Sequence, residues 1–374
     1  MKILTVLGTR PEIIRLSLLI PILDRHASHV LVHTGQNFDD RLDGLFFREL
    51  GVRKPDVHMG VRGASAAEQI GKIIAGIEPI LLEHRPDRLL ILGDTNSGLT
   101  AIVARRLGLP VLHMEAGNRC YDDRVPEEVN RRVIDHSSTV LMPYTERSRE
   151  NLLREGFAGE RIYVTGNPIK QVLDAHRAQI AGSTVLADLG LEARRFLLVT
   201  MHRAENVDVP ERLRALVEAM ARAHETYQMP VVCSLHPRTR AKVEQFGVDL
   251  GRAGVRFVEP LGFFDFVRLE ESAFCVLTDS GTVQEEACIV RTPAVTIRDV
   301  TERPETIECG SNILSGADPA TILERIAQVT SSGTGWDPPR EYLAPQVAET
   351  VARIALGYRL PDRAEEAWLA ARGR

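Results

Sequence analysis

The chain has 374 residues, of which 44% are hydrophobic and 26% are charged, and its formal net charge is −5. This composition is typical of a folded globular protein and excludes an intrinsically disordered chain. The slightly negative charge also argues against a general nucleic-acid-binding protein, for which a basic domain is expected. Domains usually hold about 100–200 residues, so the length predicts two of them.

The apolar runs and the cysteines favour a cytoplasmic protein. The run after Met1 is short and leads straight into a strand–turn–helix pattern, so we do not interpret it as a signal peptide. No run approaches the ~20 apolar residues of a membrane helix. The five cysteines form neither C-x-x-C pairs nor an even spacing, which favours free thiols in a reducing compartment.

Short apolar runs alternate with amphipathic stretches along the first half of the chain. The expected strands are 3–7, 29–33, 89–92, 111–114, 139–142 and 161–165. The expected helices are 11–23, 66–84, 97–107 and 127–136. This β-α-β order predicts a parallel, doubly wound sheet.

The same alternation begins again after Gly166-Asn167-Pro168. A polar helix is expected over 171–189, followed by strands at 196–200, 231–235, 255–258, 274–278 and 294–297. Helices are expected at 210–224, 238–245, 262–272 and 282–289. We therefore predict two Rossmann-like α/β domains, residues 1–168 and 169–360, and a charged helix within 361–374 that packs back on the first domain.

Three carboxylates stand beside the expected strand ends of the first domain: Asp94, Glu115 and Glu127. In open α/β sheets, the carboxyl ends of the strands deliver side chains into the ligand crevice. Carboxylates without a metal-ligand pattern indicate proton transfer or contacts to sugar hydroxyls. This group therefore predicts a catalytic site in the first domain.

Three strand-to-helix turns are candidate anion sites. The first is Gly8-Thr9-Arg10-Pro11-Glu12, the second runs from Thr278 to Glu286 and contains Ser280-Gly281, and the third contains Arg303-Pro304-Glu305. Backbone N–H groups and the dipole of a helix N-terminus favour phosphate at such turns, and arginine can clamp a diphosphate with paired donors. Solvated arginines and ordinary helix capping are the alternatives.

His202 follows the first expected strand of the second domain and is a candidate proton donor to a departing phosphate. A purely structural role is the alternative, and His236 is a weaker candidate of the same kind.

The motifs that mark several other classes of protein are absent from the sequence. The sequence contains no P-loop, no G-x-G-x-x-G after the first strand, no G-x-S-x-G elbow and no zinc-site spacing.

The motifs taken together resemble the non-hydrolysing UDP-N-acetylglucosamine 2-epimerase family. In family order they are GTRPE (8–12), GDT (93–95), HMEAG (113–117), PEEVNR (126–131), HRAEN (202–206), DSGTVQEE (279–286) and RDVTERPE (298–305). The resemblance implies a GT-B-like fold with the active site between two Rossmann-like domains. It implies inversion of C2 of a UDP-linked N-acetylhexosamine by elimination of UDP and its return. It also implies a homodimer and a reaction that needs neither cofactor nor metal.

The resemblance also implies roles for individual residues. Asp94, Glu115 and Glu127 match the acid/base and sugar-contacting carboxylates, and His202 matches the residue that contacts the departing diphosphate. The residues implied to bind UDP or substrate are Arg10, Arg131, Phe266, Ser280, Gly281, Glu286 and Arg303. Among these, Phe266 would stack on uracil and Glu286 would bind the ribose; a core position is the alternative for Phe266.

The sequence departs from the family pattern at two places, and the first of them bears on the substrate. The segment between Glu115 and Glu127 is short and reads Asn-Arg-Cys-Tyr-Asp at 118–122, and Thr282 stands where a second glycine is common. The short segment resembles the branch that acts on modified sugars such as UDP-2,3-diacetamido-2,3-dideoxyglucuronate. The Gln-rich segment that binds an activating substrate molecule in some members is not recognisable, so we do not expect activation by substrate.

Three other functions remain open from the sequence. A GT-B glycosyltransferase would share the nucleotide site but would need an acceptor. A hydrolysing 2-epimerase would release the free sugar and UDP. A non-catalytic nucleotide-sugar-binding protein would bind without turnover, although the combination of three carboxylates with His202 argues against it.

Overall fold

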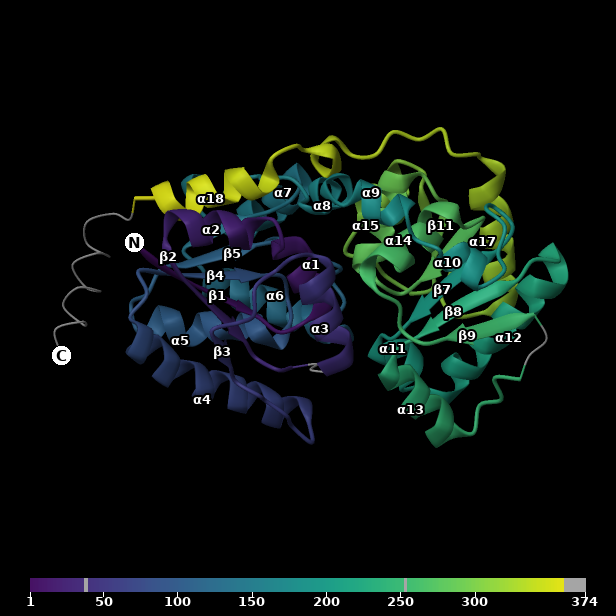
Figure 1. Cartoon of the computed structure of the whole chain (residues 1–374), viewed down its shortest axis with the longest axis horizontal. Coiled ribbons are helices and arrows are strands. Elements are labelled where there is room, and N and C mark those ends of the chain that lie inside the picture. The colour runs from purple at the N-terminus through teal and green to yellow at the C-terminus, as the bar shows by residue number, and fades with distance from the viewer. Residues whose placement is uncertain (37–39, 252–253, 360–374) are drawn as a thin grey trace. The chain divides into compact units, whose positions relative to one another are not determined.

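The computed structural model describes residues 1–36, 40–251 and 254–359, which fold into two compact α/β units (Figure 1). The first unit comprises Met1–Val172 together with the chain from Ala344 onward, and the second comprises Leu173–Leu343. Each unit is built on a six-stranded sheet in which all the paired strands run parallel. The predicted fold class of two Rossmann-like α/β domains is confirmed.

The sheet of the first unit has the strand order β3-β2-β1-β4-β5-β6. Its strands are β1 (Lys2–Leu7), β2 (Ser28–His33), β3 (Val57–His58), β4 (Arg88–Leu92), β5 (Val111–Met114) and β6 (Val140–Met142). The central strands are buried along almost their whole length, as expected for a parallel sheet covered on both faces.

The helices of the first unit cover both faces of this sheet. They are α1 (Arg10–Leu16), α2 (Leu19–His26), α3 (Asp40–Glu49), α4 (Ala66–His84), α5 (Thr100–Arg106), α6 (Pro126–His136), α7 (Glu146–Arg154), α8 (Ile169–Ala175), which leads into the second unit, and α18 (Val347–Gly357), with 3₁₀ turns η1 (Asn96–Leu99) and η2 (Gly159–Arg161). Leu4 and Val6 of β1 pack with Ile77 of α4 and Ala104 of α5 in one core cluster.

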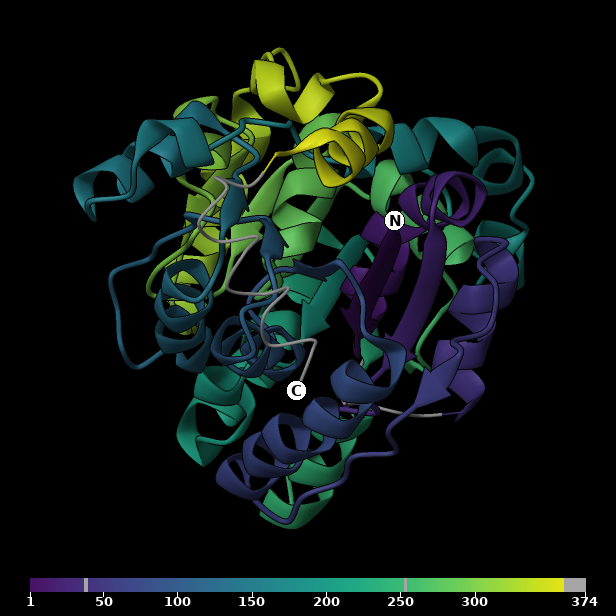
Figure 2. The ribbon, with the colours of Figure 1, turned by 90° about the vertical axis from the view of Figure 1, so that its left-hand side faces the viewer.

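The last described helix returns to the first unit. In both views α18 lies beside α2 (Figures 1 and 2). The guanidinium of Arg88 in β4 donates to the carbonyl oxygens of Ala355 and Tyr358 at the end of α18. These bonds satisfy carbonyls that a helix C-terminus leaves without an intrahelical partner.

The sheet of the second unit has the order β12-β11-β10-β7-β8-β9. Its strands are β7 (Leu197–Met201), β8 (Val231–Leu235), β9 (Val255–Val258), β10 (Cys275–Thr278), β11 (Ala294–Thr296) and β12 (Asn312–Leu314). The side chains of successive residues in β7 point alternately to the two faces of the sheet. Leu197 and Val199 join one core cluster, and Leu198 joins another, so hydrophobic side chains are buried on both sides.

The second unit has two long helices, α12 and α17, packed against each other and on one face of the sheet. Its helices are α9 (Arg177–Ala181), α10 (Val185–Asp188), α11 (Ala204–Val207), α12 (Pro210–Tyr227), α13 (Pro237–Phe246), α14 (Phe263–Ser272), α15 (Gly281–Val290), α16 (Pro304–Glu308) and α17 (Pro319–Ser331), with the 3₁₀ turn η3 (Arg340–Leu343). None of the helices over the described ranges is long and apolar enough to cross a membrane.

Both sheets reverse their strand order at the centre, and this reversal places the candidate sites. In the first sheet the chain leaves β1 toward β2 on one side and returns through β4 on the other; β7 and β10 are the corresponding strands of the second sheet. Ligands of open α/β sheets bind beyond the carboxyl ends of such a strand pair. Each unit therefore carries a candidate site beyond its two central strands.

Some sequence expectations differ from the structure. The expected helix 11–23 is broken into α1 and α2, because Pro21 cannot donate the N–H bond to Ser17 that a continuous helix needs. The expected helix 171–189 is likewise divided among α8, α9 and α10. The expected strand 161–165 forms only an isolated bridge from Leu141 to Ile162.

The division into units also differs from the expected domain limits. The first unit extends to Val172 rather than to residue 168. Residues from Ala344 onward group with the first unit, whereas the sequence expectation kept residues up to 360 in the second domain. The charged helix expected within 361–374 lies outside the described residues.

Candidate active site

The turn after β1 is held by a buried carboxyl group, that of Glu12. It accepts hydrogen bonds from the Gly8 amide (2.9 Å), the Thr9 hydroxyl (2.8 Å) and the Thr95 hydroxyl (3.1 Å). Glu12 thereby ties the turn after β1 to the turn after β4. Burial raises its pKa to about 7, although these three donors oppose the rise.

The same turn admits no side chain at Gly8 and presents Arg10 at the start of α1. A Cβ atom at Gly8 would lie 2.1 Å from Thr34 Oγ1 and 2.3 Å from Ser97 Oγ, so glycine is required. The Arg10 guanidinium lies 5.9 Å from the centre of the Phe46 ring, within the range of a cation–π contact.

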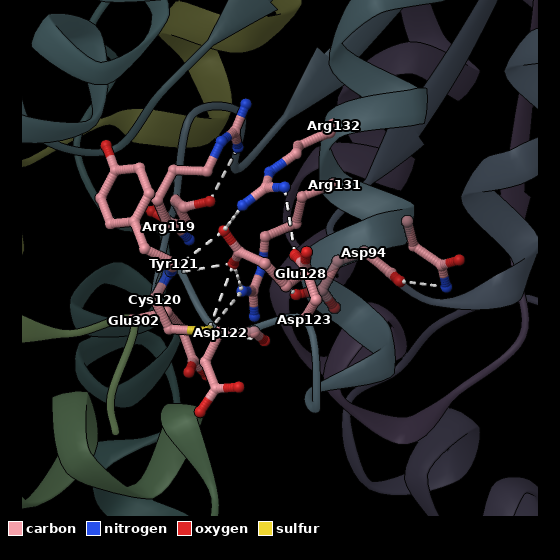
Figure 3. A network of polar contacts seen from close by, with 12 residues as sticks. Asp94, Arg119, Cys120, Tyr121, Asp122, Asp123, Glu128, Arg131, Arg132 and Glu302 are labelled. Carbon is pink, nitrogen blue, oxygen red and sulfur yellow. Dashed lines mark hydrogen bonds and ion pairs between the residues drawn. The ribbon is translucent and has the colours of Figure 1, made fainter. Parts of the chain in front are cut away.

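Arg131 of α6 joins two carboxylates of the first unit (Figure 3). Its Nε donates to Asp94 Oδ2 at 2.7 Å, and its Nη1 donates to Glu128 Oε2 at 2.7 Å. Only 2% of the Arg131 side chain is exposed, against 19% for Asp94. The arginine is therefore part of the interior, while the Asp94 carboxylate it orients reaches solvent beyond β4.

Glu128 anchors the segment before α6 (Figure 3). Its carboxylate accepts the amide hydrogens of Cys120 (3.0 Å) and Tyr121 (3.1 Å) and pairs with Arg131 and Arg132. Burial raises the pKa of Glu128, but the Cys120 amide and Arg131 outweigh it and leave the pKa below its ordinary value. Glu127, one of the predicted catalytic carboxylates, precedes Glu128 and is only half-buried.

Glu115 follows β5 in an uncommon backbone conformation. Its φ is +64°, the left-handed region that non-glycine residues seldom adopt. Its carboxylate accepts a hydrogen bond from Arg15 Nη1 at 2.8 Å and lies 3.8 Å from where a Cβ of Gly93 would stand. The predicted carboxylates Asp94 and Glu115 are thus brought to adjacent strand ends. Strained residues held by their surroundings cluster at functional sites.

A second layer of buried polar groups supports this carboxylate pair. His113 Nε2 lies 2.9 Å from the Gly93 carbonyl, and its Nδ1 lies 2.8 Å from Asp135. Asp135 also accepts from Arg119 at 2.8 Å and from the Gly117 amide at 3.2 Å. Burial raises the pKa of Asp135, but His113 and Arg119 outweigh burial, so the pKa lies below its ordinary value.

In the second unit, Asp279 organises the turn that carries His202. It is fully buried and accepts the backbone amides of His202 (2.9 Å) and Arg203 (3.0 Å) and the side chain of Asn206 (3.1 Å). His202 Nδ1 lies 3.3 Å from Asp279 Oδ1, and 37% of the His202 side chain is exposed. The histidine is therefore oriented by a carboxylate and still reaches solvent, as a proton donor requires.

Ser280 and Gly281 form the start of α15, beside β10. The Ser280 amide donates to Thr278 Oγ1 at 3.0 Å, and its hydroxyl lies 3.0 Å from that of Thr282 rather than capping the helix. A Cβ at Gly281 would lie 2.6 Å from Glu302 Oε1 and 3.7 Å from Arg303 Cζ. The predicted phosphate turn and Arg303 are therefore neighbours.

Arg303 is anchored by α15. Its Nε pairs with Glu285, and its Nη1 donates to the Glu302 carbonyl at 3.3 Å. Glu302 is fixed by Arg298 Nη1 at 2.9 Å, whose Nε pairs with Glu205 at 3.1 Å. Glu285 and the Glu302 carbonyl together hold Arg303 at the start of α16, while Arg298 and Glu205 fix the Glu302 side chain.

The two residues expected to bind uracil and ribose both lie at α15: Glu286 belongs to this helix, and Phe266 of the neighbouring α14 packs against it. Phe266 is half-buried and packs on a cluster that contains Val283 of α15, so both a core role and a stacking role fit its position. Glu286 is buried on α15, one residue beyond Glu285. The fully buried Glu270 of α14 lies close enough for Glu286 to contribute to its raised pKa, after burial as the main cause.

The structure thus groups the predicted residues by unit. Asp94, Glu115 and Arg131 gather beyond β4 and β5, and Ser280, Gly281 and Arg303 gather beside β10. The sequence prediction missed the residues that hold them, which are Glu12, Arg15, His113, Glu128, Asp135, Asp279 and Glu302. Glu285 was a candidate for binding ribose, and in the structure it pairs with Arg303. Within the described ranges, no group of three or more His, Cys, Asp or Glu side chains is arranged to hold a metal ion.

Each Rossmann-like unit carries charged groups beyond the two central strands of its sheet, the place where open α/β sheets bind their ligands. The chain belongs to the UDP-N-acetylglucosamine 2-epimerase family, whose model matches residues 22–356. Membership makes it an isomerase and confirms the predicted family.

Two relatives illustrate the range of the family. The UDP-N-acetylglucosamine 2-epimerase of Methanocaldococcus jannaschii is 38% identical over 354 residues, covering 91% of this chain and 95% of the relative. The UDP-2,3-diacetamido-2,3-dideoxy-D-glucuronate 2-epimerase of Pseudomonas aeruginosa is 39% identical over 329 residues, covering 87% and 91%.

Solved structures show the same fold. The M. jannaschii enzyme in complex with UDP-GlcNAc and UDP superposes with a TM-score of 0.90 at 38% identity, covering 95% of this chain and 99% of that one. The glycosyltransferase WaaG superposes with a TM-score of 0.54 at 15% identity over the full length of both chains, which extends the likeness to GT-B folds.

Proposed function

We propose that this chain is a non-hydrolysing 2-epimerase that interconverts a UDP-N-acetylhexosamine of the UDP-GlcNAc type with its C2 epimer. The observation that carries the proposal is the pair Asp94 and Glu115 at adjacent strand ends, with Glu127 on the neighbouring helix. Carboxylates held in differing environments can serve as acid and base; Glu115 has a positive φ and is paired with the buried Arg15, whereas Asp94 is paired with Arg131 and partly exposed.

The reaction is an anti elimination followed by its reverse. A carboxylate of the first unit takes the proton from C2 while the bond from C1 to the UDP oxygen breaks, which gives a 2-acetamidoglucal and UDP. A proton from a second carboxylate, which exchanges with solvent, then adds to the opposite face of C2, and the UDP oxygen bonds again to C1. Asp94, Glu115 and Glu127 supply the acid and the base between them.

The second unit supplies the groups that take up UDP. Amides at the start of α15 and the Arg303 guanidinium suit phosphate oxygens. His202, oriented by Asp279, would protonate the departing diphosphate. Glu286 would bind the ribose hydroxyls and Phe266 the uracil ring. The family resemblance assigns Arg10 and Arg131 of the first unit to phosphate or substrate binding.

Two measurements test the reaction. Epimerisation in D₂O should place deuterium at C2, because the returning proton comes from solvent through a side chain. Retention of the original hydrogen at C2 would rule out the elimination.

The amide variants D94N, E115Q and E127Q should each lose turnover and keep UDP binding. Near wild-type activity in all three would refute the assignment of the carboxylates.

A modified sugar is a specific candidate substrate. The P. aeruginosa relative, named for a diacetamido-glucuronate, is 39% identical to this chain, and the segment 118–122 resembles that branch. We propose a 3-acetamido or uronate derivative as the physiological substrate. A panel of UDP-sugars assayed by NMR for C2 inversion would decide it, and the highest kcat/KM on plain UDP-GlcNAc would contradict it.

The same panel separates the alternatives. A glycosyltransferase would leave C2 unchanged when no acceptor is present. A hydrolysing epimerase would accumulate UDP and free sugar. A binding protein would bind UDP-sugars without turnover.

We also propose that the enzyme works in the cytoplasm as a homodimer. The five cysteines are all free thiols, in keeping with a reducing compartment, and the dimer rests on the family resemblance. Light scattering at micromolar concentration would test the dimer.

A further inference from the structure

Two cysteines of the second unit stand close together away from the residues assigned to catalysis. Cys288 lies on α15 and Cys309 directly follows α16, and their sulfur atoms are 3.6 Å apart. The other cysteines are Cys120 in the first unit and the fully buried Cys233 and Cys275 in the sheet of the second. This pair of thiols has no part in the proposed reaction.

The pair has one buried and one accessible member. Cys288 is fully buried and joins Trp336 and Tyr342 in a small apolar cluster, with the Trp336 indole donating to its carbonyl at 3.1 Å. Cys309 is only half-buried, and its sulfur lies 3.4 Å from both Thr306 O and Ser311 Oγ. A solvent-borne oxidant would therefore meet Cys309 first.

The contact between the two sulfurs makes their acidities unequal. The hydrogen bond between the two sulfurs lowers the pKa of Cys309. The same bond, together with burial, raises the pKa of Cys288. The thiolate is the form that reacts with oxidants, so the accessible member is also the more reactive one, and its buried neighbour is placed to resolve the product.

We propose that Cys288 and Cys309 form a redox-active pair that hydroperoxides convert to a disulfide, and that the disulfide weakens the binding of uridine diphosphate by the second unit. The Cys309 thiolate attacks the peroxide oxygen and the O–O bond breaks, leaving a sulfenic acid, while the departing oxygen takes a proton from solvent and leaves as water or an alcohol. The Cys288 sulfur then bonds to the Cys309 sulfur and its proton leaves with the hydroxyl as water. The peroxide is reduced and the two thiols are oxidised.

The effect on nucleotide binding follows from the position of Arg303 between α15 and α16. A disulfide holds its sulfurs ~2.05 Å apart, so closure must draw the end of α16 toward α15. Cys288 lies three residues beyond Glu285, which pairs with Arg303 immediately before α16. Closure therefore shifts Arg303 against the phosphate turn at Ser280-Gly281.

The second half of the proposal rests on the proposed UDP site, whereas disulfide formation does not. The full-length enzyme is reduced, then treated with hydrogen peroxide or with buffer. Intact and peptide mass spectrometry identify the linkage, and calorimetry measures the affinity for UDP. The variants C288S and C309S test the pair, and C120S is the control because Cys120 is half-buried like Cys309 but has no partner sulfur within contact among the described residues.

The expected result is a Cys288–Cys309 linkage in the wild type and in C120S, with roughly tenfold weaker UDP binding that dithiothreitol restores. C288S and C309S should keep their UDP affinity after peroxide. Thiols that stay reduced, or Cys309 oxidised beyond sulfenic acid without a linkage, would overturn the proposal. A linkage with unchanged affinity would overturn its regulatory part, and reduced enzyme that does not bind UDP would instead refute the proposed function.

Discussion

Arg131 donates from Nε to Asp94 Oδ2 at 2.7 Å, and this bond orients a carboxylate that is more exposed, at 19%, than those of Glu115 and Glu128. The arginine is itself locked by Glu128 on its other side. The resemblance assigned Arg131 to substrate binding. Its burial and its two carboxylate partners favour a positioning role, in which it acts through Asp94.

The variant R131K separates these two roles. Lysine retains the charge but lacks the planar fork that serves two carboxylates at once. A positioning role predicts that kcat falls by roughly 10- to 100-fold while KM changes little, because misplacing a catalytic group costs rate. Steady-state kinetics would show the split. A rise in KM at constant kcat would instead identify Arg131 as a substrate ligand.

Neighbouring residues Glu127 and Glu128 should respond differently to the same substitution. E127Q should abolish turnover with an almost unchanged melting temperature, because Glu127 is half-buried and assigned to proton transfer. E128Q removes a buried partner of Arg131, a change that typically costs about 3–5 kcal/mol and thus on the order of 10 °C in melting temperature. Thermal denaturation and activity assays on both variants test this contrast; equal loss of stability would contradict it.

The regular features of the site could be predicted from the sequence. Asp94 and His202 each follow an apolar strand, and such strand ends meet at the crevice of a parallel sheet. The turn around Ser280-Gly281 could be found in the same way, since a strand followed by a small-residue turn and a helix is a local pattern.

The supporting contacts could not be predicted in this way, because they join distant parts of the chain. Arg15 and Glu115 are 100 residues apart and meet only after β1, β4 and β5 pair in the observed order. Glu128 stands next to Glu127 in an identical local pattern. Which of the two carboxylates faces the interior and pairs with Arg131 depends on how α6 is rotated about its own axis when it packs, and this places Glu128 inside.

Glu12 should make the stability of the first unit depend on pH. Its pKa is about 7 in the fold and 4.5 in the unfolded chain, so between these values the native state binds more protons than the unfolded one. The free energy of unfolding should therefore fall as pH rises from about 4.5 to about 7, by up to about 3 kcal/mol from this group. The variant E12Q cannot titrate and should lack this component. Denaturation at several pH values compares the two; parallel pH profiles would contradict the assignment.

Gly281 offers a test of the phosphate turn. In G281A the new methyl group would stand 2.6 Å from Glu302 Oε1, and Glu302 cannot easily retreat because it is buried and paired with Arg298. Overpacking of this kind typically costs about 1–3 kcal/mol, and the displaced turn should bind UDP at least about tenfold more weakly. G335A is the matched control, since a Cβ there meets no atom within 4 Å. Calorimetric titration of both variants with UDP measures the effect. Wild-type affinity in G281A would show that phosphate is bound elsewhere, and equal losses in G281A and G335A would show that the effect is not specific to this turn.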